Sequence, residues 1–312
     1  MEKLIMLKPY FSHTIWGGTR LREEFGYDEK GDDIGECWGI SAHPSGESTV
    51  CGGEYDGFSL SRLWEEHREL FGYDRGDRFP LLIKIIDARD DLSIQVHPDD
   101  EYAGRHENGS LGKTECWYVL DCPEDGELVI GHNASSREEL VSMIDEGRWD
   151  DLIRRVKVRP GDMIQIEPGT VHAITSGVCV LETQQSSDIT YRLYDYGRLQ
   201  NGKPRQLHLD QSKDVITVPA PSADKQIIRA RKTAPNSVDR LISCDHYTVS
   251  KVSVKGEFSF GSDAGYLCAS VILGSGRIFD TDVSKGSHFI ITTEGAGKVE
   301  LSGDMELIIS RA

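Results

Sequence analysis

The chain lacks the cysteine patterns of disulfide-rich and thiolate-zinc proteins. Its seven cysteines are odd in number, scattered along 312 residues, and include no C-x-x-C pair. Secreted disulfide frameworks use even numbers of cysteines, and structural zinc sites use closely paired ones. We therefore expect reduced thiols, and neither a disulfide framework nor a zinc knuckle.

Basic residues are too few to balance the acidic ones, and long hydrophobic runs are missing. There are 35 Lys and Arg against 52 Asp and Glu, a net charge of −17, which repels nucleic acid and anionic lipid. Charge also interrupts residues 1–8 too early for a signal peptide. The sequence predicts a cytoplasmic protein without nucleic-acid or membrane partners. An anionic substrate would need local basic residues, which the stretch 192–205 offers.

Two common catalytic motifs are absent. The sequence contains neither G-x-x-x-x-G-K-[ST] nor G-x-S-x-G, and the glycines near residues 265 and 274–276 fit turns better than a dinucleotide loop. These absences remove the simplest cases for nucleotide hydrolysis and for α/β-hydrolase chemistry.

Short β-branched or aromatic runs bounded by turn residues fill most of the chain. Many short strands with few helices favour an antiparallel sandwich or barrel over a Rossmann sheet. The clearest predicted strands are 81–86, 92–96, 116–120, 127–130, 163–166, 178–181, 247–254, 267–273, 288–292 and 305–310.

Helical periodicity interrupts this pattern at about 59–71 and 136–155, where Ser136 and Glu139 have capping-box spacing. We expect both segments to be inserts packed on a β core. A polar, proline-containing stretch at 213–237 predicts a boundary. We divide the chain into a catalytic domain, 1–237, with its closing linker, and a smaller C-terminal β domain, 238–312.

Four residues can be read together as a divalent metal site: Gln95, His97, Glu115 and His172. Alternation along a strand places Gln95 and His97 on the same face of one predicted strand. On a second predicted strand it places Glu115 on the same face as Trp117. Taken singly, each has an ordinary alternative: a polar pair at a strand end, a salt bridge from Glu115 to Lys84 or Lys113, and a surface histidine. Imidazole and oxygen ligands without thiolate suit a catalytic metal better than a structural one.

Glu182 and Arg192 form a second candidate cluster on neighbouring predicted strands. A carboxylate and a guanidinium in one barrel mouth would provide a base and a group that stabilises developing negative charge. An ion pair holding two strands together is the alternative.

Four segments in order, residues 92–100, 112–118, 168–173 and 184–195, closely resemble type I mannose-6-phosphate isomerases, especially the short bacterial form. The resemblance spans about residues 5–210. It implies a mainly β fold: a cupin (jelly-roll) barrel with helical inserts, plus a smaller C-terminal β-sandwich or cupin-like domain. It also implies one zinc ion per chain and interconversion of mannose 6-phosphate and fructose 6-phosphate through a cis-enediol.

The resemblance also implies roles for single residues. His97, Glu115, His172 and, least firmly, Gln95 fall on metal-ligand positions; Arg192 and Glu182 fall on catalytic ones; Lys113 and Arg198 match substrate-binding ones, Arg198 standing where some relatives have lysine. The base is Glu182 or a metal-bound water. In 238–312, His246 and His288 are isolated, which favours structural roles. An isomerase for another sugar and a non-catalytic sugar-phosphate-binding cupin are the alternative functions.

Overall fold

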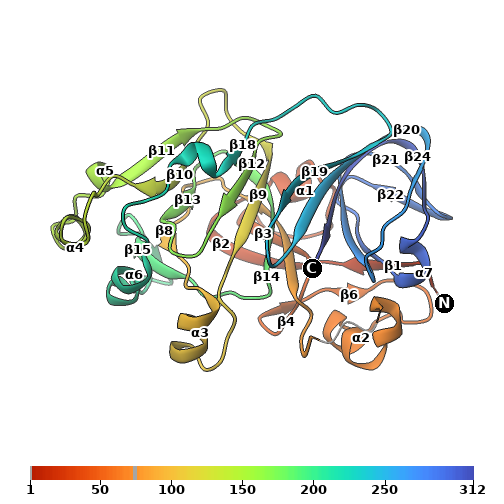
Figure 1. The fold of residues 1–312 in the computed structure, drawn as a ribbon, viewed down its shortest axis with the longest axis horizontal. Helices are drawn as coiled ribbons and strands as arrows, with labels where there is room; N and C mark the ends of the chain where they lie inside the picture. The colour runs from red at the N-terminus through yellow and green to blue at the C-terminus, as the bar shows by residue number, and fades with distance from the viewer. Residues whose placement is uncertain (1, 73–75) are drawn as a thin grey trace. The chain divides into compact units, whose positions relative to one another are not determined.

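The computed structural model describes residues 2–72 and 76–312. Residues 1 and 73–75, which fall within the predicted domain 1–237, lie outside this description. The chain forms two compact units: Met1–Ser12, Thr19–Ile85 and Arg231–Ala312 make unit 1, and His13–Gly18 and Ile86–Ala230 make unit 2. These units differ from the two predicted domains, whose independence as folding units stays a prediction. Figure 1 shows the course of the chain.

Unit 1 is built on an antiparallel sheet that joins the two ends of the chain. Strand β1 pairs with β23 through Leu4 and Ile291, because both strands carry apolar residues toward the same core. The strands run in the order β19 (Ser237–Ser243), β20 (Thr248–Phe260), β24 (Val299–Arg311), β21 (Leu267–Ile278), β23 (His288–Ile291), β1 (Leu4–Lys8) and β6 (Thr49–Val50), with β22 (Thr281–Ser284) beside β21.

Short elements complete unit 1. The predicted helix at 59–71 is present as α2 (Leu60–Glu66), capped by the Ser59 side chain, and a 3-10 turn η1 (Arg68–Phe71). The others are α1 (Arg20–Glu23), β3 (Ile34–Ile40), β4 (Ala42–His43), β5 (Gly46–Glu47) and α7 (Thr293–Ala296); β2 (Tyr10–Gly18) and β7 (Leu81–Asp87) contain points at which the two units divide.

Unit 2 contains two antiparallel arrays of strands. The first is a five-stranded sheet in the order β11 (Ile153–Lys157), β10 (Glu127–His132), β13 (His172–Ile174), β8 (Ile94–Val96) and β15 (Tyr191–Tyr194). The second runs β18 (Ile227–Ile228), β12 (Met163–Ile166), β9 (Glu115–Asp121) and β14 (Cys179–Gln185). Among the described residues the strands form separate sheets and do not close into one barrel.

The two faces of the five-stranded sheet pack against different partners. Ile130 and Ile174 join a core with Trp117 and Ile164 of the second array. Ile94 and Val96 point to the opposite face, where they meet residues of the helical segments α4 (Arg137–Asp145), α5 (Trp149–Leu152) and α6 (Leu209–Val215). Figure 1 shows these helices at the outer side of the sheet. The remaining elements are α3 (Asp100–His106), η2 (Ala223–Lys225), β16 (Leu199–Gln200) and β17 (Lys203–Pro204).

The predicted insert at 136–155 has a clear local cause. Ser136 accepts a hydrogen bond from the Glu139 backbone N–H, which caps α4, while the Glu139 carboxylate accepts from Ser135 rather than Ser136. Leu140, Met143 and Ile144 form the buried stripe of this helix. The segment ends in strand β11, which the sequence did not predict.

Among residues 2–72 and 76–312, no helix is both long and apolar enough to cross a membrane.

Candidate active site

Strand register in unit 2 brings the predicted metal ligands to one place. On β8, Gln95 lies opposite His172 of β13 on one side and opposite Arg192 of β15 on the other. Residues that lie directly opposite in a sheet point to the same face. Gln95, His172 and Arg192 therefore share the face that packs toward β9, the strand that begins with Glu115.

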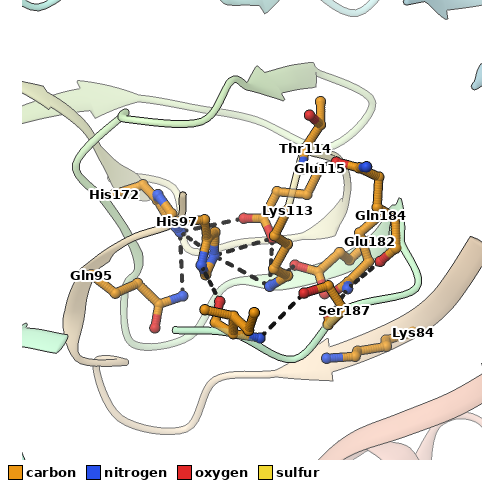
Figure 2. Close-up of polar contacts among 12 residues, drawn as sticks. Lys84, Gln95, His97, Lys113, Thr114, Glu115, His172, Glu182, Gln184 and Ser187 are labelled. Carbon is orange, nitrogen blue, oxygen red and sulfur yellow. Dashed lines mark hydrogen bonds and ion pairs between the residues drawn. The ribbon is translucent and has the colours of Figure 1, made fainter. Parts of the chain in front are cut away.

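Three buried side chains converge from different elements (Figure 2). The Nε2 atoms of His97 and His172 are 3.1 Å apart. Glu115 Oε2 lies 3.5 Å from His97 Nε2, and Glu115 Oε1 lies 3.4 Å from His172 Nε2. His97 is 1% exposed, and the other two are fully buried. In the described part of the chain this is the one cluster of histidine, cysteine or acidic side chains that could hold a metal ion.

Backbone carbonyls orient both imidazoles. His97 Nδ1 lies 2.7 Å from the carbonyl oxygen of Ile189, and His172 Nδ1 lies 2.8 Å from that of Thr170. A carbonyl can only accept, so each Nδ1 carries the proton and each Nε2 presents a lone pair to the centre. Fixing the tautomer in this way is typical of metal-binding histidines.

Two nitrogen donors face these lone pairs. The Lys113 ammonium lies 2.7 Å from Glu115 Oε2 and 3.3 Å from His97 Nε2, and the Gln95 amide nitrogen lies 3.3 Å from His172 Nε2. Turning the Gln95 amide over would present its oxygen instead, since the two ends of an amide have nearly the same shape. The ion pair between Lys113 and Glu115 was the simpler alternative for Glu115. It is present, but within a larger set of converging groups.

The electrostatics of the cluster favour neutral histidines beside a charged carboxylate. Burial, and then the Lys113 ammonium, hold the pKa of His97 well below its usual range. Burial also lowers the pKa of His172. Burial alone would raise the pKa of Glu115, but the charge of the Lys113 ammonium and its hydrogen bond to the carboxylate help to outweigh burial, and that pKa is lowered. Two bare imidazole nitrogens and a carboxylate are the donor set that zinc accepts. The residues present therefore fit a divalent metal.

The second predicted cluster is arranged differently from its ion-pair alternative. The Glu182 carboxylate accepts a hydrogen bond of 3.0 Å from the Trp117 indole and lies 4.0 Å from the Lys113 ammonium. Arg192 Nε instead donates to Ser93 Oγ at 3.1 Å, and its Nη1 donates to the carbonyl of Gln206. Glu182 and Arg192 both belong to the described part of the chain, and no ion pair joins them.

Ser93 connects the arginine to the metal-site residues, and the sequence analysis missed it. Its hydroxyl lies between Arg192 Nε and, at 3.5 Å, Gln95 Oε1. Its position two residues before Gln95, within the predicted strand 92–96, was the available signal. Arg198, predicted to bind substrate, donates to the Asp195 carboxylate at 2.6 Å and to the carbonyl of Asp91.

Comparisons with known proteins match nearly the whole chain. The family model described as the catalytic domain of type I phosphomannose isomerase matches residues 4–131, and the one described as the cupin domain of mannose-6-phosphate isomerase matches residues 237–312. The mannose-6-phosphate isomerase ManA of Bacillus subtilis is 49% identical over 311 residues, 98% of each chain. This chain belongs to the type I phosphomannose isomerase family. It is therefore an enzyme of an isomerase family.

Solved structures agree with that membership. The crystal structure of mannose 6-phosphate isomerase from Bacillus subtilis superposes with a TM-score of 0.91 at 45% identity, and the match covers 100% of both chains. A mannose 6-phosphate isomerase bound with zinc and yttrium shares the fold, with a TM-score of 0.79 at 18% identity over 99% of each chain. The mainly β, cupin-type fold that the resemblance implied is confirmed.

Proposed function

We propose that this chain interconverts mannose 6-phosphate and fructose 6-phosphate and that it uses one divalent metal ion per chain, which we propose to be zinc. His97, Glu115 and His172 would hold the ion, and Gln95 would join them after its amide turns over. The observation that carries this proposal is the set of two oriented Nε2 lone pairs and one buried carboxylate, whose closest atoms lie within 3.5 Å of one another.

The reaction moves one proton between C1 and C2 of the sugar and one between the two oxygens, so no oxidant is consumed. A zinc ion bound at this site would act as a Lewis acid that polarises the sugar carbonyl. Arg192, a permanent cation held by Ser93 and the Gln206 carbonyl, would stabilise negative charge on the oxygens of the cis-enediol.

Glu182 is our proposed base. Its carboxylate is 2% exposed and is oriented by the Trp117 indole, so it can take the proton from C2 and return it to C1 with little exchange with water. Lys113 lies between the Glu115 and Glu182 carboxylates and would contact the substrate oxygens there. A cytoplasmic location stays a prediction from composition.

The test is formation of fructose 6-phosphate from mannose 6-phosphate by purified protein, before and after chelation and zinc restoration. We expect turnover that chelation abolishes and zinc restores. Glu182→Gln should keep the metal and lose turnover by about 100- to 10,000-fold, the usual contribution of general acid–base catalysis. Asp162→Asn is the matched control, because Asp162 is also a fully buried carboxylate but pairs with Arg229.

Three outcomes separate the alternatives. Metal-dependent turnover of another aldose phosphate, but not of mannose 6-phosphate, would assign a different sugar. Tight binding of mannose 6-phosphate without turnover by zinc-loaded, folded protein would favour the non-catalytic cupin. A Glu182→Gln variant as active as Asp162→Asn would remove Glu182 as the base.

A further inference from the structure

Three arginines surround one buried carboxylate at the end of β15. Asp195 is 4% exposed, and it accepts hydrogen bonds from Arg205 Nε at 2.7 Å and Arg198 Nη2 at 2.6 Å. Arg192 precedes it on the same strand, and the charges of Arg205 and Arg198 both bear on Arg192. Three guanidinium charges against one carboxylate leave a local positive excess in a chain whose net charge is −17.

The three arginines differ in how fully their donors are used. Each guanidinium nitrogen of Arg198 already has an acceptor in the protein: Nε donates to the Asp195 carbonyl, Nη1 to the Asp91 carbonyl and Nη2 to the Asp195 carboxylate. Arg205 gives only Nε and Nη2 to Asp195. Among the described residues, Nη1 of Arg205 and Nη2 of Arg192 have no hydrogen-bond partner.

The segment that carries Arg205 lies directly against Arg192. Arg192 Nη1 donates to the carbonyl of Gln206, and the backbone of His208 donates to the carbonyl of Arg192. Arg192 is in turn separated from His172 by the single strand β8, a distance of two strand spacings or about 10 Å. A hexose phosphate can therefore reach from the metal-site residues to Arg192 and Arg205.

We infer that Arg205 is the phosphate-binding residue for the substrate, that Asp195 positions it, and that Arg198 orders the turn instead of contacting the phosphate. This inference rests on the proposed function. Asp195 accepts hydrogen bonds from two nitrogens along one edge of the Arg205 guanidinium, which fixes its plane and leaves Nη1 available to a ligand. A planar, oriented guanidinium is well suited to a phosphate dianion.

The experiment compares three arginine-to-glutamine variants at a saturating zinc concentration. Arg205→Gln should raise the KM for mannose 6-phosphate about 10- to 100-fold, the usual loss for a hydrogen bond to a charged group. It should change kcat little, because a phosphate remote from C1 and C2 is bound alike in ground and transition states. Competitive inhibition by inorganic phosphate should weaken by a similar factor.

Arg229→Gln is the matched control, since Arg229 also pairs with a buried aspartate, Asp162, at 2.8 Å. It should leave KM and phosphate inhibition near wild type. Arg198→Gln should lower the melting temperature more than it raises KM. If Arg205→Gln folds poorly, Arg205→Lys can replace it in the experiment. Lysine keeps the charge but loses the paired hydrogen bonds to Asp195, so this variant should raise KM by an intermediate factor.

A KM for Arg205→Gln no higher than that of Arg229→Gln would overturn the inference, as would a larger KM effect from Arg198→Gln. Failure of the proposed function looks different: wild type would then not turn over mannose 6-phosphate at all. In that case calorimetry with inorganic phosphate still tests the anion site. Phosphate binding that is weaker for Arg205→Gln than for wild type would support the site, and equal binding to both proteins would reject it.

Discussion

Each unit contains a cluster of polar groups around buried histidine, His288 in unit 1 and His97 with His172 in unit 2, and the two clusters satisfy their ring nitrogens differently. In unit 1, His288 is 1% exposed; its Nδ1 meets the Ser270 hydroxyl at 2.7 Å and its Nε2 meets the Tyr27 hydroxyl at 2.8 Å. Hydroxyls can donate or accept, so both ring nitrogens have suitable partners without a cation. Burial lowers the pKa of His288 to about 4, which keeps the ring neutral.

In unit 2, the partners of His97 and His172 force a different outcome. Each Nδ1 faces a carbonyl that can only accept, so each Nε2 is an acceptor, and the two acceptors lie beside each other and Glu115, with the Lys113 ammonium and the Gln95 amide as donors. A group of acceptors this close is stabilised by positive charge, which the Lys113 ammonium supplies here and a metal ion would supply at the centre. Burial of a histidine therefore says little about function, whereas the convergence of acceptors identifies the site. The structural role expected for His288 agrees with this contrast.

The largest effect should come from removing one metal-binding imidazole. His97→Ala or His172→Ala should lower metal content and turnover together, with kcat/KM falling about 1,000-fold or more, because Lewis-acid stabilisation is worth several kcal/mol. His288→Gln serves as the matched control from unit 1, and it should keep both metal and turnover. A metal-free His172→Ala variant with full activity would show that the unit 2 cluster does not serve turnover by binding a metal.

Replacing Arg192 separates charge stabilisation from metal binding within unit 2. Arg192→Ala should keep the metal and lower kcat about 100- to 1,000-fold, the range seen when one donor to a developing oxyanion is removed. Metal analysis and steady-state kinetics on the same sample provide the measurement. A near-normal kcat would show that Arg192 has no catalytic role.

A loss confined to stability is expected in unit 1. His288→Gln should destabilise the fold by about 1–3 kcal/mol, because it removes a buried ring that contacts the Ser270 and Tyr27 hydroxyls. Gly39 adds a constraint, since a Cβ there would lie 2.3 Å from the His288 ring. Chemical denaturation would measure the loss. A change in metal content on this substitution would contradict the separation of the two clusters.

The last expected effect is on the pH dependence of stability. The pKa of His288 is lowered to about 4 in the folded chain, so the unfolded chain binds a proton at higher pH than the folded one does. This histidine should therefore cost stability as pH falls from about 6.5 to about 4, and no further cost should accrue below that. Wild type should lose more stability than His288→Gln over this range. Parallel curves for the two proteins would show that His288 is not the titrating group.

Much of the metal site could be predicted from the sequence because its parts are local. The two-residue spacing of Gln95 and His97, and the strand that begins at Glu115, follow from alternation within single strands. The carbonyl that orients His97 could not be predicted so easily, because it belongs to Ile189, 92 residues away, whereas the one that orients His172 belongs to Thr170, two residues away.

Long-range pairing explains the other omissions. Nothing local in Leu4 indicates a partner at Ile291, and nothing local in Tyr27 indicates His288, 261 residues away. Asp195 and Arg205 were visible only as part of a charged stretch. Their roles depend on the burial of Asp195, which follows from the packing of β15 and the chain that returns beside it.

The most direct test is a crystal structure of the zinc-loaded protein with anomalous scattering recorded at the zinc edge. We predict one strong peak per chain, at about 2.0–2.2 Å from His97 Nε2, His172 Nε2 and a Glu115 oxygen. The same data should show no peak at His288. A folded, active crystal with no metal at the first cluster, or with metal at the second, would contradict the account.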